Sequence, residues 1–283
     1  MHQPTPCPGL EDRRLSLPRL LAQTRRATSE TVHVIRSTLL RRHGFRHAFS
    51  TREGGVSAPP YDALNLGSHL GDVDDSVREN RARFAKTLGV SLDRLFEQRQ
   101  VHGYFVREIG TTDDVRAIAD AEGDVLVARV AGLAIAARTA DCVPVLIAHP
   151  PTGHVAAVHA GWRGAVAGVV PIAIESLVHD PAELIAAVGP HIRVGAFEIG
   201  EEVAREMERA ASGRPVVDRS CAKPRGDLAK LVELQLLDAG LPQTAIDDVG
   251  GCTHSDAAHF FSHRRDRGKT GRHLSAIVAR TSR

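Results

Sequence analysis

Three residues, His102, Cys142 and His159, have the side chains that catalytic metal sites use. Neutral imidazole and thiolate are good ligands for a borderline-soft divalent cation, and catalytic zinc sites combine three protein ligands with one open position. The sequence between Cys142 and His159 suits two neighbouring strands joined by the turn PPTG. Spacing alone favours a simpler interpretation, in which Cys142 is a small hydrophobic residue of a buried strand.

The residues next to Cys142 and His159 strengthen the case for a site. Asp141 interrupts an otherwise apolar run, and a charged residue there needs a partner or a function. We expect it either to orient a ligand histidine or to form a buried salt bridge with an arginine. After His159, the segment AGWRG leads into a helix whose start favours an anion, and Arg163 can add a bidentate contact. Trp162 fits a pocket wall and a core anchor equally well.

The sequence predicts that the three candidate ligands are carried by strand-forming segments. Residues 132–164 predict an apolar strand that contains Cys142, a turn, a second strand that ends at His159, and then a helix. His102 is expected in the middle of a strand-forming segment, residues 94–109, interrupted at Gly103. The other predicted elements are strands at 31–40, 121–130, 182–190 and 273–280, and helices at 74–88, 165–178, 198–211 and 227–241.

The order of these elements predicts the fold class. Strands alternate with helices, but some strand pairs are joined by short turns, which favours a mixed β-sheet flanked by helices over a strictly parallel sheet. We therefore predict one α/β domain over residues 31–283. Residues 1–30 are rich in Pro, Arg, Ser and Thr, and we expect a mobile N-terminal extension with one short helix at about 17–25.

Composition and motifs exclude several functional classes. The formal net charge is +2, and no apolar run reaches the roughly 20 residues of a membrane span, so we expect neither nucleic-acid nor membrane binding. Four cysteines without a CxxC pair and an N-terminus without a secretory pattern favour a cytoplasmic protein. The Gly-rich nucleotide loops, HExxH, GxSxG and the deaminase HxE and PCxxC signatures are all missing. The sequence does not indicate the oligomeric state.

Two further segments carry polar residues that suit a ligand. The turn-rich segment 43–72 includes Arg52 and Asn65, although a surface Ω-loop explains it equally well. Near the C-terminus, four arginines lie close together in the sequence and predict anion contacts at one place: Arg264, Arg265, Arg267 and Arg272.

With these residues in view, the chain resembles the YfiH family, also called the laccase-domain or multicopper polyphenol oxidase family. The resemblance extends over about residues 45–278. It rests on STREGGVS (50–57), LNLGSHLGD (64–72), VRENR (77–81), QVHG (100–103), TADCVPVL (139–146), AVHAGWRG (157–164), VGPHI (188–192), FFSHRRD (260–266) and TGR (270–272). The order of these segments makes the match specific, whereas QVHG alone carries little information.

The resemblance implies a fold, a metal site and an activity. The fold is similar to that of the cytotoxic necrotizing factor catalytic domain. The ligands fall on His102, Cys142 and His159, with zinc as the implied metal and copper reported for some members. The implied reactions are phosphorolysis of adenosine, inosine and methylthioadenosine, which yields the base and a ribose 1-phosphate, and hydrolytic deamination of adenosine. The implied partners are therefore purine nucleosides and phosphate.

Roles for the remaining candidates follow from these reactions. We expect Cys142, Asp141 and Arg163 in the catalytic group, and Arg52, Asn65, Trp162 and Arg264 in substrate binding. The arginines are candidates for phosphate, and the asparagine for a ribose hydroxyl or the edge of the base. The chain departs from the family at His263, where an aromatic residue is usual, and in a longer turn before TGR.

Two alternatives remain open. A metal-free cysteine hydrolase with a Cys142–His159 dyad could act on a peptidoglycan precursor. Polyphenol oxidation is disfavoured, because three ligands cannot build the several copper centres of a laccase.

Overall fold

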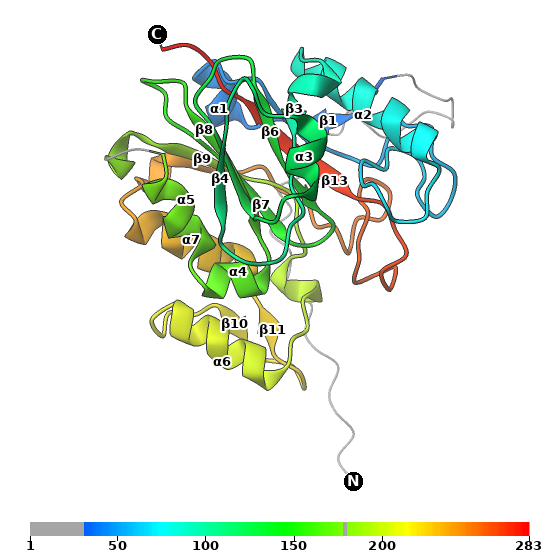
Figure 1. Ribbon diagram of the computed structural model, residues 1–283. Coiled ribbons are helices and arrows are strands. Elements are labelled where there is room, and N and C mark those ends of the chain that lie inside the picture. Colours follow the sequence, from blue (N-terminus) through cyan, green and yellow to red (C-terminus); the bar gives the residue numbers. More distant parts are fainter. Residues whose placement is uncertain (1–30, 178–179, 283) are drawn as a thin grey trace.

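Two β-sheets lie face to face at the centre of the molecule, and helices cover their outer faces (Figure 1). The computed structural model describes residues 31–177 and 180–282. One sheet has the strand order β1 (Val34–Ile35), β2 (His47–Ser50), β13 (His273–Val278), β6 (Ala134–Thr139) and β3 (Leu95–Phe96). The other has the order β12 (Ile246–Asp248), β9 (Ile185–Val188), β7 (Val143–Ala148), β8 (Val155–Ala160), β5 (Val125–Ala128) and β4 (Val106–Ile109).

Both sheets are mixed. In the first, β6 is antiparallel to β13 and parallel to β3. In the second, β7 is antiparallel to both of its neighbours, whereas β4 is parallel to β5. The predicted class, a mixed α/β fold flanked by helices, is confirmed. The prediction of one sheet is wrong, because apolar residues on both faces of a strand fit one sheet between helices as well as two stacked sheets.

The helices divide between the two outer faces (Figure 1). The six-stranded sheet is covered by α4 (Trp162–Val166), α5 (Val169–Glu175), α6 (Glu201–Ala210) and α7 (Leu228–Asp238). The outer face of the five-stranded sheet packs against α2 (Asp74–Leu88). Two short helices, α1 (Thr38–Arg42) and α3 (Val115–Asp120), and the hairpin of β10 (Val217–Asp218) and β11 (Arg225–Gly226) lie at the margins.

Alternation along each strand builds the core. In β7, Val145 and Ile147 pack toward the helices, whereas Leu146 faces the other sheet, where it meets Phe49 and Ile277. Successive side chains of a strand point to opposite faces, so one apolar strand contributes to two layers. This double burial explains why the central strands are almost continuously apolar.

Several predicted elements change in the structure. The single strand predicted around Cys142 is two strands, β6 and β7, which belong to different sheets. Residues 31–40 form β1 and the start of α1, which begins because the Ser37 side chain accepts a hydrogen bond from Leu40 N–H. His102 lies in a loop between β3 and β4 rather than in a strand.

The helix predicted at 165–178 is also interrupted. It is divided into α4 and α5 at Gly168, whose φ is 85°, and Pro171 lies in the first turn of α5, where a missing N–H costs little. The other long helices agree with prediction. Gly89 ends α2 in the left-handed region, and Asp227 caps α7 through Lys230 N–H. Residues 1–30, and with them the predicted extension and its short helix, lie outside the described residues.

Among the described residues, no helix combines the length and apolar character that a membrane span requires.

Candidate metal centre

His102, Cys142 and His159 come together at one end of the two sheets. Their ligand atoms all lie within 4.8 Å of one another, and His102 Nε2 is 3.8 Å from Cys142 Sγ. The imidazole rings of His102 and His159 meet edge to face, with their centroids 4.8 Å apart. The three side chains come from the loop before β4, the link between β6 and β7, and the penultimate position of β8.

Asp124, at the start of β5, holds two of these side chains in place. Its carboxylate accepts hydrogen bonds from the backbone N–H groups of Val101, His102 and Gly103 at 3.3, 3.0 and 2.7 Å, which fixes the loop that carries His102. It also accepts a hydrogen bond from His159 Nδ1 at 2.7 Å. Because Nδ1 then carries the proton, Nε2 of His159 keeps its lone pair for a metal.

The carboxylate of Asp141 binds a neighbouring loop rather than a ligand histidine. It accepts a hydrogen bond from the Thr253 hydroxyl at 2.6 Å and from the Arg264 backbone N–H at 2.6 Å. The Asp141 backbone has a φ of 106°, which L-residues rarely adopt. These bonds therefore hold the sharp turn that presents Cys142. Neither expectation for Asp141 is met: the carboxylate that orients a ligand histidine is Asp124, and Asp141 binds the backbone of Arg264 rather than its side chain.

A glycine after β8 makes room for the cluster. A Cβ on Gly161 would lie 2.5 Å from Cδ2 of His102 and 3.4 Å from Sγ of Cys142. The first distance is shorter than any ordinary contact, so a larger residue would displace the His102 ring. This requirement explains the first glycine of the segment AGWRG.

The electrostatics of the cluster favour a thiolate. Burial works to raise the pKa of Cys142, but the charge of His159 and the hydrogen bond from His102 outweigh it and lower the pKa to about 6. Burial likewise opposes the charged form of His159, but the Cys142 thiolate and Asp124 raise the pKa of this imidazole. The pKa of Asp124 is lowered against the effect of burial, mainly by its bond to His159.

These donors fit a zinc-like cation. Two imidazole nitrogens and one thiolate sulfur from three rigid segments match a three-ligand catalytic site. The carboxylate–histidine pair of Asp124 and His159 is the support that such ligands usually have. His102 is exposed, so the cluster is open to solvent on that side.

A cavity of about 370 Å³ opens above the cluster. The segments that form it bring two of the predicted substrate-binding residues, Trp162 and Arg264, to its wall. Its lining consists of Gln100, His102, Arg138, Thr139, Ala140, Asp141, Cys142, His159, Trp162, Ile192, Phe197, His263, Arg264 and Arg272.

Three predicted residues lie outside this lining. The Arg52 side chain donates hydrogen bonds to Asp62 and to the Ala257 carbonyl, and it lies over the ring of Phe261. The Arg163 guanidinium stacks on Trp162, 4.4 Å from the centre of the ring, on the exposed side of α4.

Asn65, the third, is fully buried and bonds to the protein itself. Its side-chain oxygen accepts hydrogen bonds from the N–H groups of Gly67 and Arg272, and its amide donates to Asp72. It therefore acts on the cavity through Arg272 rather than by direct contact.

Comparisons with known proteins agree with this architecture. Residues 46–280 match the family described as multi-copper polyphenol oxidoreductase laccase. The chain belongs to this family, which includes YfiH. It is 40% identical to a purine nucleoside phosphorylase of Deinococcus radiodurans, over 82% of this chain and 88% of that one. It is 38% identical to the purine nucleoside phosphorylase YfiH of Escherichia coli, over 81% and 91% of the two chains.

Solved structures give the same result. The crystal structure of YlmD from Geobacillus stearothermophilus matches with a TM-score of 0.77 and 33% identity, over 83% of this chain and 91% of that one. A Neisseria meningitidis protein matches with a TM-score of 0.75 and 32% identity, over 88% and 99% of the two chains. The YfiH-type fold predicted from the sequence motifs is therefore confirmed.

Within this YfiH-family chain, sequence reasoning missed several residues at the site. Asp124 gave one signal, because it is a charged residue directly before the buried run VLV. Arg138 gave a similar one inside an apolar strand, and Gln100 stands within QVHG. Phe197 gave none, since only the tertiary structure brings the segment after β9 to the cavity.

Proposed function

We propose that this chain is a metal-dependent purine nucleoside phosphorylase that cleaves adenosine, inosine and methylthioadenosine with phosphate, and that the same site deaminates adenosine by hydrolysis. The observation that carries this proposal is the His102–Cys142–His159 cluster at the base of a cavity lined by three arginines. The relatives in D. radiodurans and E. coli, both named purine nucleoside phosphorylases, support the same reaction class.

The metal in this proposal is zinc, with copper as the alternative ion. His102, Cys142 and His159 would hold it, with Asp124 behind His159. A divalent cation there supplies Lewis acidity, which stabilises negative charge that develops on an oxygen atom.

The chain's own residues supply binding and orientation. Trp162 and Phe197 both line the cavity, and aromatic side chains there suit a purine ring. Arg138, Arg264 and Arg272 make the cavity electropositive, which suits an anionic co-substrate. Asp141 keeps the turn before Cys142 in shape, so that the thiolate faces the cavity.

Product analysis with adenosine tests the proposal. Zinc-loaded protein should release adenine and ribose 1-phosphate when phosphate is present, and inosine with or without phosphate. Cys142→Ala should abolish both activities and the bound zinc, whereas Cys252→Ala, which removes another free thiol, should change neither. Absence of all three products from protein with stoichiometric zinc would refute the proposal.

One observation favours a second candidate, a metal-free cysteine hydrolase acting on a peptidoglycan precursor. The Cys142 thiol has a lowered pKa and the adjacent His159 a raised one, as in thiolate–imidazolium dyads. The two candidates differ in metal content. Purified protein that still hydrolyses a peptidoglycan precursor after dialysis against a strong chelator, and that loses this activity on thiol alkylation, would support the hydrolase.

Polyphenol oxidation has weaker support. Within residues 31–177 and 180–282, three-residue groups of potential metal ligands are limited to His102, Cys142 and His159. A multicopper oxidase needs several copper centres with their own histidine and cysteine ligands.

A further inference from the structure

Arg138 lies in β6, and Arg272 directly precedes the neighbouring strand β13, at the wall of the cavity. Strand β13 pairs with β6 in the register Leu274↔Arg138, and Arg272 stands two residues before Leu274. Side chains two residues apart in a strand share a face, so the two arginines are diagonal neighbours across the strand pair. Both line the cavity that contains Cys142.

Arg272 is held firmly but without a carboxylate among its hydrogen-bond partners. Its backbone N–H donates to Asn65 Oδ1 at 2.9 Å, and its Nη1 donates to the carbonyl oxygens of Thr270 and Gly271 at 2.9 and 3.0 Å. A Cβ on Gly67 would lie 2.8 Å from Cγ of Arg272, so the side-chain stem packs against a glycine backbone. This positioning orders the guanidinium, whose positive charge is offset in part by the nearby Asp141 carboxylate and Cys142 thiolate.

Arg138 is positioned by the loop that carries His102. The Gln100 side chain donates to the Arg138 carbonyl and accepts from its N–H, both at 2.7 Å. Glu97 lies 3.5 Å from the Arg138 guanidinium, but the same carboxylate also pairs with Arg81. Two guanidinium groups thus share one carboxylate.

The result is an excess of positive charge next to the thiolate. Burial and then the charge of Arg138 lower the pKa of Arg272, and together they outweigh the opposite effect of Asp141 and Cys142, so the two arginines are close enough to repel each other. Arg264 adds a third guanidinium at the rim, where it donates to the Glu198 carbonyl at 2.7 Å and lies over Phe197. Two partly buried like charges repel each other, and an anion bound between them relieves that repulsion.

We propose that Arg138 and Arg272 form the subsite for inorganic phosphate, with Arg264 closing its rim. Its role in catalysis rests on the proposed phosphorolysis, whereas anion binding can be measured without turnover. A planar guanidinium offers paired N–H donors that match two oxygens of phosphate. Arg52 and Arg163, the other candidates for this role, are engaged outside the cavity lining.

The subsite suits the chemistry of phosphorolysis. An oxygen of hydrogen phosphate forms a bond to the ribose C1′ atom while the bond from C1′ to the purine nitrogen breaks. The electron pair of that bond leaves with the purine, which takes up the proton that the phosphate gives up. Two fixed guanidinium groups hold the phosphate oxygens and leave one oxygen free to react.

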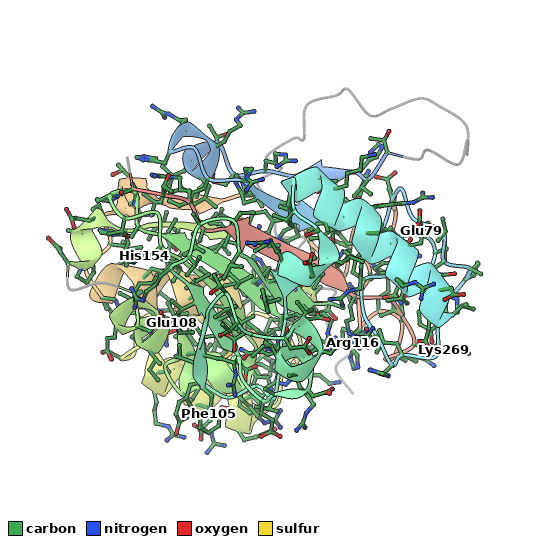
Figure 2. All side chains as sticks on the ribbon, turned by 45° about the horizontal axis from the view of Figure 1, so that its top comes forward. Glu79, Phe105, Glu108, Arg116, His154 and Lys269 are labelled. Carbon is green, nitrogen blue, oxygen red and sulfur yellow. The ribbon has the colours of Figure 1, made fainter. Side chains whose placement is uncertain are left out.

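The test compares Arg272→Gln with Arg116→Gln, in which an exposed arginine of α3 is changed in the same way (Figure 2). With zinc-loaded enzyme, we expect Arg272→Gln to raise the KM for phosphate by about tenfold to a hundredfold, as the loss of a charged hydrogen bond predicts. The KM for adenosine should change by no more than about twofold. Arg116→Gln should match the wild type in both constants.

Phosphate binding without nucleoside provides an independent measurement. Calorimetric titration of the zinc-loaded wild type with phosphate should give a binding isotherm. Sulfate should compete with phosphate for the same site. Arg272→Gln and Arg138→Gln should weaken it, and Arg272→Lys, which keeps the charge but loses the paired donors, should give an intermediate value. The lysine variant also covers the case in which the glutamine variant does not fold.

The outcomes separate this subsite from the proposed function. An unchanged phosphate KM in a folded Arg272→Gln or Arg272→Lys enzyme would overturn the subsite and leave phosphorolysis standing. Arginine-dependent phosphate binding in a protein that never cleaves a nucleoside would retain the subsite and reject the function. A purely structural role for Arg272 predicts lower stability and lower kcat with an unchanged affinity for phosphate.

Discussion

At the scale of single residues, Asp124 links the parts of the candidate metal centre. It is almost fully buried, and its two oxygens accept bonds from the His102 loop and from His159. A buried carboxylate is stable only when such partners compensate for its lost hydration. One residue therefore sets both the position of one ligand and the tautomer of another.

Replacement of Asp124 by asparagine tests this role. The amide would place N–H donors against the N–H groups of Val101 or Gly103, and the support of His159 would weaken. We expect the affinity for zinc to fall by about tenfold to a hundredfold and the free energy of unfolding of the apo-protein to fall by about 1–3 kcal/mol. Competition with a chromophoric chelator and urea unfolding measure the two effects. Asp114→Asn, at the exposed start of α3, is the control.

Gly161 makes a different single-residue prediction. In Gly161→Ala the new methyl group would meet His102 at 2.5 Å, so the exposed ring should swing away from Cys142. We expect zinc affinity to fall at least about tenfold because one of three ligands is displaced. Gly195→Ala is a matched control, because nothing lies within 4 Å of a Cβ at that position. Equal zinc affinity in the two variants would contradict the expected displacement.

At the scale of elements, α2 helps to position Arg272 through one buried side chain. Asn80 accepts a hydrogen bond from Val56 N–H and donates to Ser57 Oγ and to the carbonyls of Ala63 and Asn65. The segment that it holds ends at Asn65, whose side chain binds Arg272 N–H. The turn-rich segment 43–72 is therefore a support for the cavity wall, which explains its polar residues without direct substrate contact.

Asn80→Ala should break this support. Several buried donors and acceptors would lose their partner, so we expect the free energy of unfolding to fall by about 3 kcal/mol. The KM for phosphate should rise as well, because Arg272 loses its fixed position. Urea unfolding and steady-state kinetics provide the measurements, and Arg78→Ala, on the exposed side of the same helix, should change neither. A stability loss with an unchanged phosphate KM would separate α2 from the cavity.

At the scale of the whole molecule, the site lies where the two sheets meet. Cys142 stands on the link from the five-stranded sheet to the six-stranded sheet, and His159 ends a strand of the latter. Two buried histidines near this site, His191 and His273, are held neutral. Burial lowers the pKa of His191 to about 4 and that of His273 to about 3.

These two histidines predict how stability depends on pH. Their pKa is lower in the folded chain than in the unfolded one, so the unfolded chain binds their protons first. Their contribution to the free energy of unfolding should therefore be fully present above about pH 6.5. It should fall as the pH drops toward 4, by about 1.4 kcal/mol per pH unit for each histidine.

Histidine NMR spectra give the direct measurement. The wild-type signals of the two residues are assigned by their absence from the spectra of His191→Gln and His273→Gln. In the folded wild type, both signals should have the chemical shifts of neutral imidazole at pH 5, whereas all histidines in urea-unfolded protein should be protonated at that pH. Protonation of either residue near pH 6.5 in the folded protein would refute the prediction.

The sequence by itself determined the long elements and predicted the three candidate metal ligands that the structure brings together. Helix α2 follows from its stop at Gly89, α7 from its Asp227 cap, and β13 from its apolar pattern, because these signals are local. His102, Cys142 and His159 followed from ligand chemistry and from the motifs around them. The sequence also placed Arg264 and Arg272 in one group of arginines, since they are close along the chain.

Only the tertiary structure decided the rest. Whether the apolar run around Cys142 is one strand or two depends on the second sheet, since burial on both faces gives the same pattern in either case. The choice of Asp124 over Asp141 as the support of His159 depends on the antiparallel pairing of β5 with β8, which no local signal encodes. Arg138 joins Arg272 only through the register of β6 and β13, because hydrogen bonds between strands distant in sequence set which side chains become neighbours.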